Sequence, residues 1–279
     1  MSPSPELASV LAGVDAWGAD NVAVATVRLD GSTFHGPVDR VLPLASVTKL
    51  LTSYGCLIAV EEGTLDLDEP AGEPDGCTVR HLLAHAGGYG FDGGPLTPPG
   101  RKRIYSNTGF EALADHLAKL SGMDAADYVT AAVVEPLGMA STTIAGSLAH
   151  GATSTVTDLA RFTRELLDPT LLAAETLAAA TTVQFPGLDG VLPGFGTQTP
   201  NDWGLGFELR DHKSPHWTGS TNSTRTFGHF GAAGTFLWVD PDFEVALVVL
   251  TDRPFGEWAT LAWPPFADQV LAAAVTGNR

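Results

Sequence analysis

The N-terminal part of the chain carries a pattern of apolar residues that predicts a β-hairpin. A Val- and Ala-rich run covers residues 21–27, the pair Asp30-Gly31 follows it, and residues 32–38 can return as a second strand. Asp-Gly between two such runs favours a tight turn because both residues tolerate positive φ angles. We therefore expect two paired strands at this end of the chain.

From Ser46 the spacing of apolar residues changes to that of an amphipathic helix. Apolar side chains recur three or four residues apart, at Val47, Leu50, Leu51, Tyr54, Leu57 and Ile58. This period places them on one helical face, and Gly63 is a natural C-terminal stop. The pattern predicts a long helix that begins at Ser46.

The middle of the chain is predicted to be mainly helical. Residues 64–106 are rich in Gly, Pro and Asp and predict mostly irregular structure. Helices are predicted, in chain order, at residues 79–85, from Ser106 or Asn107 to 120, at 125–134 and from Thr155 or Thr157 to 167. Residues 185–204 form a Gly/Pro-rich connection to the last part of the chain.

The C-terminal part returns to strands. These are predicted at residues 207–209, 224–228, 235–239 and 244–250, before a final helix at 266–275. The order of strands, helices, strands and helix predicts an α/β fold with an antiparallel sheet flanked by helices, plus a mainly helical lobe. We expect residues 1–45 and 204–279 to form the sheet lobe and residues 46–203 the helical lobe, with an active site between them.

Composition excludes several classes of protein. The chain has 279 residues, of which 44% are hydrophobic and 17% charged, and this composition argues against a disordered protein. The net charge is −17 and the sequence pI is about 4.6. A protein this acidic is a poor partner for nucleic acid or for an anionic membrane surface.

Compartment and redox state are indicated by the same sequence. No uninterrupted apolar stretch reaches the ~18 residues that a membrane span needs, and Glu6 and Asp15 interrupt the apolar N-terminus, which has no cationic start. We expect a cytoplasmic protein, or one whose export signal was trimmed. Cys56 and Cys77 are too few for a disulfide framework or a zinc ribbon, so we expect two ordinary thiols, buried or half-buried.

The strongest chemical signal is Ser46-Val47-Thr48-Lys49. On a helix, residues three apart share a face, so the Ser46 hydroxyl and the Lys49 amine lie within reach of each other. A lysine half buried by its neighbours loses part of its preference for the charged form and can accept the serine proton. The alternative is a helix-capping serine followed by a solvated lysine, and Ser-x-x-Lys by itself occurs often by chance.

Two further segments carry candidate polar groups. Tyr105 precedes a predicted helix and can share a proton with Lys49, while Asn107 can bond a substrate carbonyl or the lysine. His229 lies in Gly-His-Phe-Gly before Ala232, where small residues allow a ligand to approach the backbone. Taken singly, these segments also fit a packed aromatic before a helix and a glycine-rich turn with a surface histidine.

Taken together and in this order, the segments resemble those of the penicillin-recognising serine hydrolases. The chain is most similar to the class C β-lactamase group, which also contains D,D-carboxypeptidases, D-aminopeptidases and family VIII esterases. The resemblance covers about residues 20–255. It includes the segments HLLAHAGGYG, PPGRKRIYSNTGFEALA, VVEPLGMASTT, GATSTVTDLARF, WGLGFEL and FGHFGAAGTFLWVDP.

This resemblance implies roles for the site residues. It makes Ser46 the acylated nucleophile and Lys49 with Tyr105 the pair that handles protons. It places the Ser46 and Ala232 N–H groups around the tetrahedral oxyanion. Substrate-side groups are Asn107, His229 and Gly231. No metal and no cofactor is implied.

One departure from the pattern bears on the substrate. The third segment reads His-Phe-Gly where classical β-lactamases have Lys-Thr-Gly, so a fixed positive charge for a substrate carboxylate is missing. We therefore expect ester or peptide-like substrates rather than efficient β-lactam hydrolysis.

The expected function is a serine hydrolase with a small-molecule substrate. A transacylase and an inactive ligand-binding or sensor protein of the same fold are the alternatives, and the oligomeric state stays open.

Other polar and aromatic residues carry weaker predictions. His81 and His85 have the spacing of a zinc helix but no third ligand, so packing is the better interpretation for His85. The basic run at residues 101–103 can steer an anion to Tyr105 or can be a solvated loop. Core packing is preferred over pocket lining for Trp203, Trp217 and Trp238.

Overall fold

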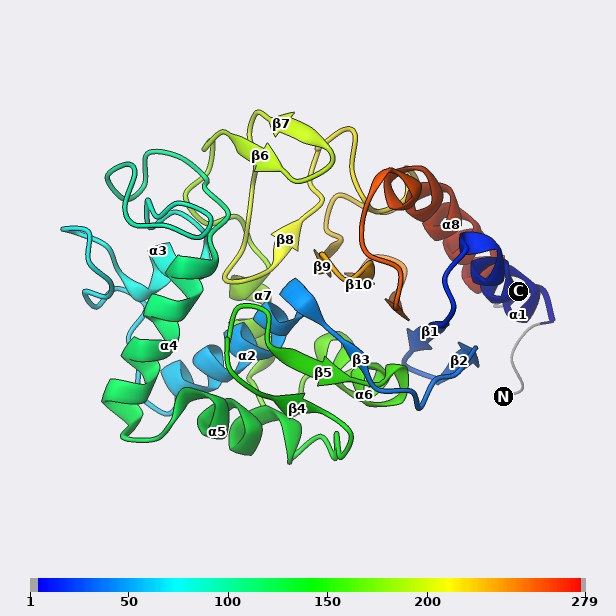
Figure 1. Ribbon diagram of the computed structural model, residues 1–279, viewed down its shortest axis with the longest axis horizontal. Helices are drawn as coiled ribbons and strands as arrows, with labels where there is room; N and C mark the ends of the chain where they lie inside the picture. Colours follow the sequence, from blue (N-terminus) through cyan, green and yellow to red (C-terminus); the bar gives the residue numbers. More distant parts are fainter. Residues whose placement is uncertain (1–4, 277–279) are drawn as a thin grey trace.

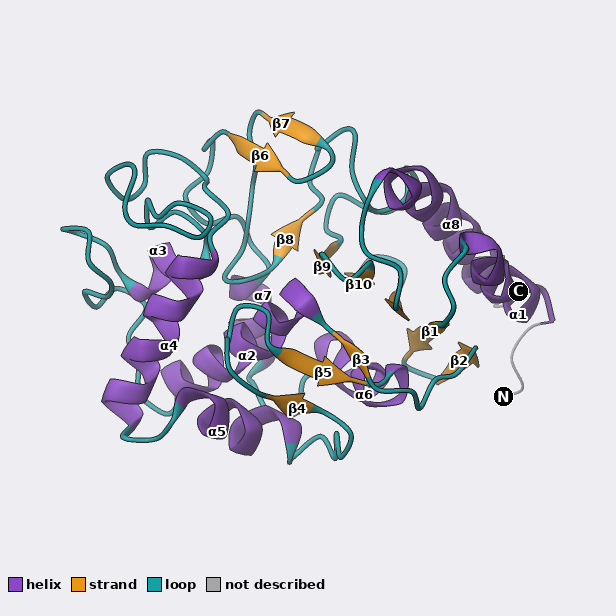
Figure 2. Ribbon diagram, in the orientation of Figure 1, coloured by secondary structure: helices purple, strands orange, loops and turns teal. Residues whose placement is uncertain are grey.

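A six-stranded antiparallel sheet forms the centre of the protein (Figures 1 and 2). The structure is a computed structural model that describes residues 5–276. Strand order across the sheet is β2 (Gly31–His35), β1 (Val22–Arg28), β11 (Val245–Thr251), β10 (Thr235–Asp240), β9 (Phe227–Gly231) and β8 (Glu208–Leu209). The first and last parts of the chain therefore share one sheet, and the predicted fold class is confirmed.

The central strands are buried on both faces. In β11 all residues are buried, and alternate side chains point to opposite sides of the sheet. Leu247 and Val249 pack with the terminal helices, whereas Val248 and Leu250 pack with the central helices. This explains why the strand appears in the sequence as a continuous apolar run rather than as an alternating one.

The two ends of the chain cover one face of the sheet. Helix α1 (Pro5–Leu11) continues into the 3-10 helix η1 (Ala12–Trp17) and packs against the long helix α8 (Glu257–Thr276). Figure 1 shows α1 and α8 side by side at one end of the molecule. Trp17 and Trp263 are buried between these elements and the sheet.

The other helices cover the opposite face and extend beyond it. Helix α6 (Val156–Leu167) lies on β1, β10 and β11. Helix α2 (Thr48–Glu61) is buried along almost its whole length. It packs against α4 (Asn107–Ser121), α5 (Ala125–Val129) and the π-helical turn η3 (Thr130–Val134), and α3 (Val79–Leu83) packs on α4. Helix α7 (Ala174–Ala180) adds Leu177 and Ala180 to the same core. Thr155 and Ser106 cap α6 and α4 by accepting backbone hydrogen bonds.

Two small sheets complete the fold. Strands β3 (Leu42–Pro43), β5 (Ala152–Ser154) and β4 (Thr143–Ile144) form one, and the hairpin of β6 (Gly190–Leu192) and β7 (Gly196–Gln198) forms the other. The β6–β7 hairpin lies within the predicted Gly/Pro-rich connection and, in Figure 1, above the start of α2. Within residues 5–276, no helix has both the length and the apolar character needed to cross a bilayer.

Several predicted boundaries were wrong. Strand β9 lies three residues later than expected, and β2 ends at His35 rather than at residue 38. Helix α8 begins at Glu257 and not at Phe266. Pro264 and Pro265 lie inside this helix and obscure its pattern in the sequence. Ser46 belongs to a 3-10 turn, and the α-helix begins two residues later.

Candidate active site

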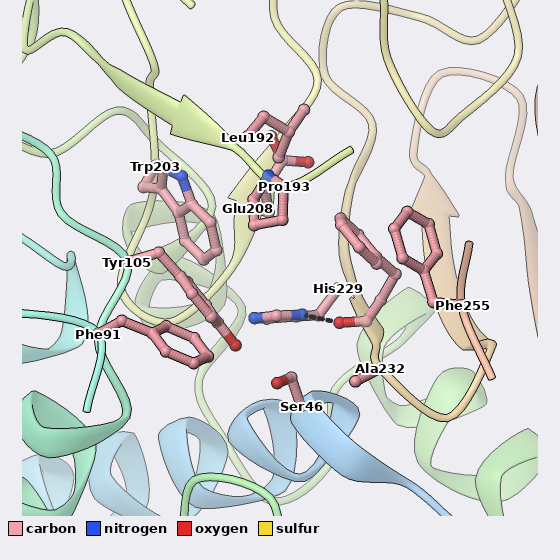
Figure 3. A pocket seen from close by; sticks show the side chains of 11 residues that line it. Ser46, Phe91, Tyr105, Leu192, Pro193, Trp203, Glu208, His229, Ala232 and Phe255 are labelled. Atoms are coloured by element: carbon pink, nitrogen blue, oxygen red, sulfur yellow. Dashed lines mark hydrogen bonds between the residues drawn. The ribbon is translucent and has the colours of Figure 1, made fainter. Parts of the chain in front are cut away.

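Ser46 lies in a strained turn at the start of α2. The 3-10 turn η2 (Ala45–Val47) leads directly into the helix. Ala45 has a φ of 45°, a conformation that non-glycine residues adopt at a cost and that is common at functional sites. The turn lifts Ser46 out of the helix, and its side chain lines a cavity (Figure 3).

The Lys49 side chain is fully buried beside this turn. Its Nζ donates to Asn107 Oδ1 at 2.6 Å and to the Ala149 carbonyl at 2.9 Å. The same nitrogen lies 4.7 Å from the centre of the Tyr105 ring and 5.4 Å from that of Phe110. The lysine is therefore held between two acceptors and two aromatic faces, and the alternative of a solvated lysine was wrong.

Burial determines the protonation of Lys49. Removal of the ammonium from water lowers the pKa of Lys49 to about 7, although the carboxylates of Glu111 and Asp92 oppose the shift. A substantial fraction of this amine is consequently neutral at physiological pH. A neutral amine can accept a proton, which an ordinary surface lysine cannot do.

The Tyr105 hydroxyl faces Ser46 across the cavity. Figure 3 shows the two hydroxyl groups pointing toward each other. Tyr105 directly precedes Ser106, the residue that caps α4. Burial raises the pKa of the Tyr105 hydroxyl, and the neighbouring Ser46 hydroxyl only partly opposes the shift. Tyr105 is therefore a neutral phenol in the resting protein, and Lys49 is the group of this pair that titrates near neutrality.

The third predicted segment contributes His229 from strand β9. Its Nδ1 donates to the Phe230 carbonyl at 2.6 Å, so the proton of the neutral ring is on Nδ1. Burial lowers the pKa of His229 to about 3, and Lys49 adds to the shift. Nε2 is a bare acceptor with no hydrogen-bond partner among the described residues, and Figure 3 places it on the Tyr105 side of the ring. His229 thus presents no positive charge.

Gly231 brings strand β9 against the Ser46 turn. A Cβ atom at this position would lie 2.6 Å from the carbonyl oxygen of Leu44, which is closer than atoms can pack. Thr235 Oγ1 donates to the same oxygen at 3.0 Å and holds the sheet to the turn. Any side chain at Gly231 would push these elements apart.

Two backbone N–H groups are free at this junction. In the described part of the chain, neither the Ser46 N–H nor the Ala232 N–H has a hydrogen-bond acceptor. Figure 3 shows Ala232 beside Ser46 at the base of the cavity. Such a pair of N–H groups is suited to stabilise a developing oxyanion.

The cavity is small and mostly apolar. It has a volume of about 120 Å³. Its walls are Ser46, Phe91, Tyr105, Leu192, Pro193, Trp203, Glu208, His229, Phe230, Ala232 and Phe255. A more open groove of about 680 Å³ shares Phe91, Tyr105 and Pro193 with the cavity and includes Lys102 and Asp189. The cavity itself has no cationic side chain in its wall.

The sequence analysis did not predict a buried ionic network that lies behind the cavity. The Glu208 carboxylate accepts hydrogen bonds from Lys213 Nζ, His216 Nε2 and Trp217 Nε1. All four side chains are buried, and His216 and Lys213 outweigh burial and lower the pKa of Glu208 to about 2. No spacing rule in the sequence indicates this cluster, because its members meet only when β8 packs against the following loop.

Aromatic packing supports Tyr105. The His85 ring lies 4.6 Å from the rings of Tyr105 and Trp203, and its Nδ1 accepts from the Ser106 N–H. The packing role expected for His85 agrees with this position. Trp203 lines the cavity, contrary to the preference for core packing, whereas Trp217 and Trp238 are buried in the core as expected.

Both interpretations of the basic run at residues 101–103 were wrong for Arg103. Its guanidinium is buried and donates to the carbonyl groups of Ala84, Gln184, Phe185 and Asn201. It fixes three loops beside the site and cannot steer a ligand. Only Arg101 and Lys102 remain exposed in this run.

Other side chains that sequence reasoning singled out lie apart from this chemistry. His81 stacks on Phe185 at 4.2 Å and contacts Thr78 Oγ1. Cys56 and Cys77 are free, buried thiols, as expected. Within residues 5–276 no group of three or more His, Cys, Asp or Glu side chains is arranged to hold a metal ion.

Comparison with known proteins identifies the family. A family model described as Beta-lactamase matches residues 23–272. The chain belongs to the beta-lactamase family. Proteins of this beta-lactamase family are generally serine hydrolases, and they act on small ester, amide or peptide-like substrates.

Curated relatives of this beta-lactamase family member match only part of its length. Penicillin-binding protein 4* of Bacillus subtilis is 28% identical over 139 residues, which are 38% of this chain and 31% of that protein. The D-alanyl-D-alanine-carboxypeptidase/endopeptidase AmpH of Escherichia coli is 27% identical over 150 residues, or 40% of this chain and 39% of that protein. The matched segments thus span well under half of either relative.

A solved structure matches almost the whole chain. A crystal structure of a protein described as a β-lactamase from Mycobacterium bovis is 53% identical, with a TM-score of 0.94, and covers 95% of this chain and 99% of its own. The resemblance seen in the sequence is therefore confirmed for family and fold. This chain has the beta-lactamase and penicillin-binding-protein fold of serine hydrolases and acyltransferases.

Proposed function

We propose that this protein is a serine hydrolase that cleaves an ester or amide bond through an acyl-Ser46 intermediate. One observation carries the proposal: the Ser46 and Tyr105 hydroxyl groups face each other in one cavity, directly beside a buried Lys49 whose pKa is lowered to about 7. A nucleophile, a relay and a base are the parts that acyl transfer needs.

In the proposed acylation step, the Ser46 proton passes to the neutral amine of Lys49, with the Tyr105 hydroxyl as relay. Ser46 Oγ forms a bond to the substrate carbonyl carbon, and the carbonyl oxygen takes up negative charge between the Ser46 and Ala232 N–H groups. The carbon–leaving-group bond then breaks, and the leaving group receives the proton through Tyr105. Water repeats the sequence on the acyl-enzyme and releases the acid.

We further propose that the acyl group is small, apolar and uncharged. The cavity beside Ser46 is bounded by Phe230, Phe255 and Trp203, and its volume is about 120 Å³. His229 is neutral, and Glu208 adds a carboxylate rather than a cation. A substrate carboxylate, such as that of a β-lactam, would find no positive partner in the wall of this cavity.

A transacylase is a second candidate, favoured by the groove beside the cavity. The groove of about 680 Å³ shares Phe91, Tyr105 and Pro193 with the cavity, so an alcohol or amine acceptor larger than water has room next to the acyl-enzyme. Product analysis in the presence of competing alcohols and amines separates transfer from hydrolysis.

We also propose the division into two lobes that the sequence predicts, with residues 46–203 as one lobe and residues 1–45 and 204–279 as the other; residues 1–4 and 277–279 of this prediction lie outside the described residues. Ser46 and Tyr105 belong to the first range, and His229 and Ala232 to the second. The site would then depend on the junction of the lobes.

The proposal is tested by intact-mass detection of an acyl-enzyme. The protein is mixed with p-nitrophenyl esters of short apolar acids, a D-alanyl peptide and a chromogenic cephalosporin. The expected result is an added acyl mass and rapid turnover with the esters, both lost in Ser46→Ala and kept in Ser32→Ala, which alters an exposed serine of β2. Turnover that survives Ser46→Ala overturns the proposed nucleophile, and efficient cephalosporin turnover overturns the proposed substrate class.

A further inference from the structure

The segment Gly90–Asp92 is bonded to the start of helix α4. Ser106 Oγ donates to the Gly90 carbonyl at 2.6 Å, and the Asn107 N–H donates to the Phe91 carbonyl at 2.7 Å. A third bond joins side chains, because Asn107 Nδ2 donates to Asp92 Oδ1 at 2.8 Å. Sequence reasoning assigned no role to Asp92.

Asp92 is the outer member of a hydrogen-bonded chain that ends at Lys49. Lys49 Nζ donates to Asn107 Oδ1 at 2.6 Å, and the other end of the same amide donates to Asp92. An ionised carboxylate only accepts hydrogen bonds, so Asp92 must face the NH₂ end of the amide. The Asn107 carbonyl oxygen is thereby turned toward the lysine.

The orientation of this amide controls the lone pair of Lys49. A neutral lysine amine has two N–H bonds and one lone pair, and Asn107 Oδ1 and the Ala149 carbonyl provide one acceptor for each N–H. The lone pair is then free to take a proton. If the Asn107 amide were reversed, its NH₂ group would donate to that lone pair and would occupy the base.

We propose that Asp92 is a positioning residue: its carboxylate holds the Asn107 amide in the orientation that leaves the lone pair of Lys49 free. This inference rests on the proposed function, in which Lys49 is the base. Asp92 is exposed and lies outside the cavity wall, so it acts through Asn107 and does not touch the substrate.

The charge of Asp92 has a separate effect on Lys49. Of the groups that act on the lysine, Glu111 from α4 and Asp92 favour the ammonium, whereas His85, His229 and Tyr105 are neutral. Removal of either carboxylate therefore lowers the pKa of Lys49. Charge and orientation can be separated because Glu111 hydrogen-bonds Ser147 and not Asn107.

Three variants separate the two effects. Asp92→Asn removes the charge and keeps an oxygen acceptor for the amide, Asp92→Ala removes both, and Glu111→Gln is the matched control that removes a carboxylate without touching the amide. Because Asp92 is exposed, we expect both of its variants to fold. Circular dichroism and thermal unfolding check the fold of all three variants.

The titration of Lys49 is read directly by NMR of protein labelled with ¹³C at the lysine ε-carbons. The chain has four lysines, so the signals are few, and the Lys49→Met variant assigns the one of interest. We expect Asp92→Asn and Glu111→Gln each to lower the Lys49 midpoint by about 0.5 pH unit. Asp92→Ala should lower it further, because a reversed amide stabilises the neutral amine.

Rates give a second readout. At pH 9, where Lys49 is neutral in every variant, we expect acylation of Ser46 by a p-nitrophenyl ester to fall about tenfold or more in Asp92→Ala through kcat, with little change in KM. Asp92→Asn and Glu111→Gln should retain most of the rate.

Equal Lys49 midpoints in Asp92→Asn and Asp92→Ala overturn the positioning role, whether or not the protein turns over esters. Absence of any Ser46-dependent acylation in the unaltered protein overturns the proposed function instead.

Discussion

At the scale of single residues, the protonation of Lys49 separates this site from an ordinary surface. Burial removes the hydration of the ammonium form of Lys49 and so destabilises it. The two acceptors, Asn107 Oδ1 and the Ala149 carbonyl, can bind a neutral amine as well as an ammonium. The lowered pKa is therefore a consequence of where the chain buries the side chain, three residues after Ser46.

The pH dependence of activity follows from this pKa. Protonated Lys49 cannot accept the serine proton, so kcat/KM for a neutral ester should rise with pH. It should reach half of its plateau near pH 7, where the pKa of Lys49 lies. The profile of kcat/KM against pH measures this midpoint.

His229 provides the control for that profile. The pKa of His229 is lowered to about 3, so its ring stays neutral over the whole pH range in which Lys49 titrates. In His229→Gln the plateau can change, but we expect the midpoint to stay. A midpoint that moves with His229 would assign the titration to the histidine and contradict the role of Lys49.

At the scale of elements, the site depends on the close approach of strand β9 to the turn before α2. Gly231 allows that approach, since a Cβ there would lie 2.6 Å from the Leu44 carbonyl oxygen. The separation of the two elements sets the distance between the Ser46 and Ala232 N–H groups.

Gly231→Ala should therefore weaken the oxyanion site. We expect kcat to fall by about 100-fold, the usual effect of losing one oxyanion donor, while the fold is retained. Stopped-flow acylation measures the loss. Gly13→Ala is the control, since a Cβ at Gly13 meets nothing within 4 Å. Equal rates in the two variants would show that β9 has no part in stabilising the oxyanion.

At the scale of the whole molecule, the net charge of −17 acts on any charged substrate. The basic run before Tyr105 offers little compensation, because Arg103 is buried and paired with carbonyl groups. Neutral substrates do not experience this long-range field.

The salt dependence of kcat/KM tests the influence of this charge. For a neutral ester we expect no change between low and moderate ionic strength. For an anionic ester of similar size kcat/KM should rise severalfold as salt screens the repulsion over about 10 Å.

Replacement of Arg101 and Lys102 by Gln should change kcat/KM for the anionic ester only slightly. A large loss confined to that substrate would restore a steering role for this run.

The order of residues was enough to indicate the family pattern, the fold class and four of the residues that line the cavity, namely Ser46, Tyr105, His229 and Ala232. Ser46 and Lys49 are three residues apart, on either side of the junction between the 3-10 turn and α2, so their proximity is local and the sequence can indicate it. Continuous apolar runs such as that of β11 likewise predict buried strands, because burial on both faces leaves no place for polar residues.

The charge states of these residues and the orientation of their side chains follow from the folded chain. The neutral state of His229, the burial of Arg103, the Glu208 network and the bond from Asp92 to Asn107 all depend on contacts between segments that are distant in the sequence. Burial and hydrogen bonding shift pKa values and orient amides. Both are properties of the packed chain, and the local order of residues does not encode them.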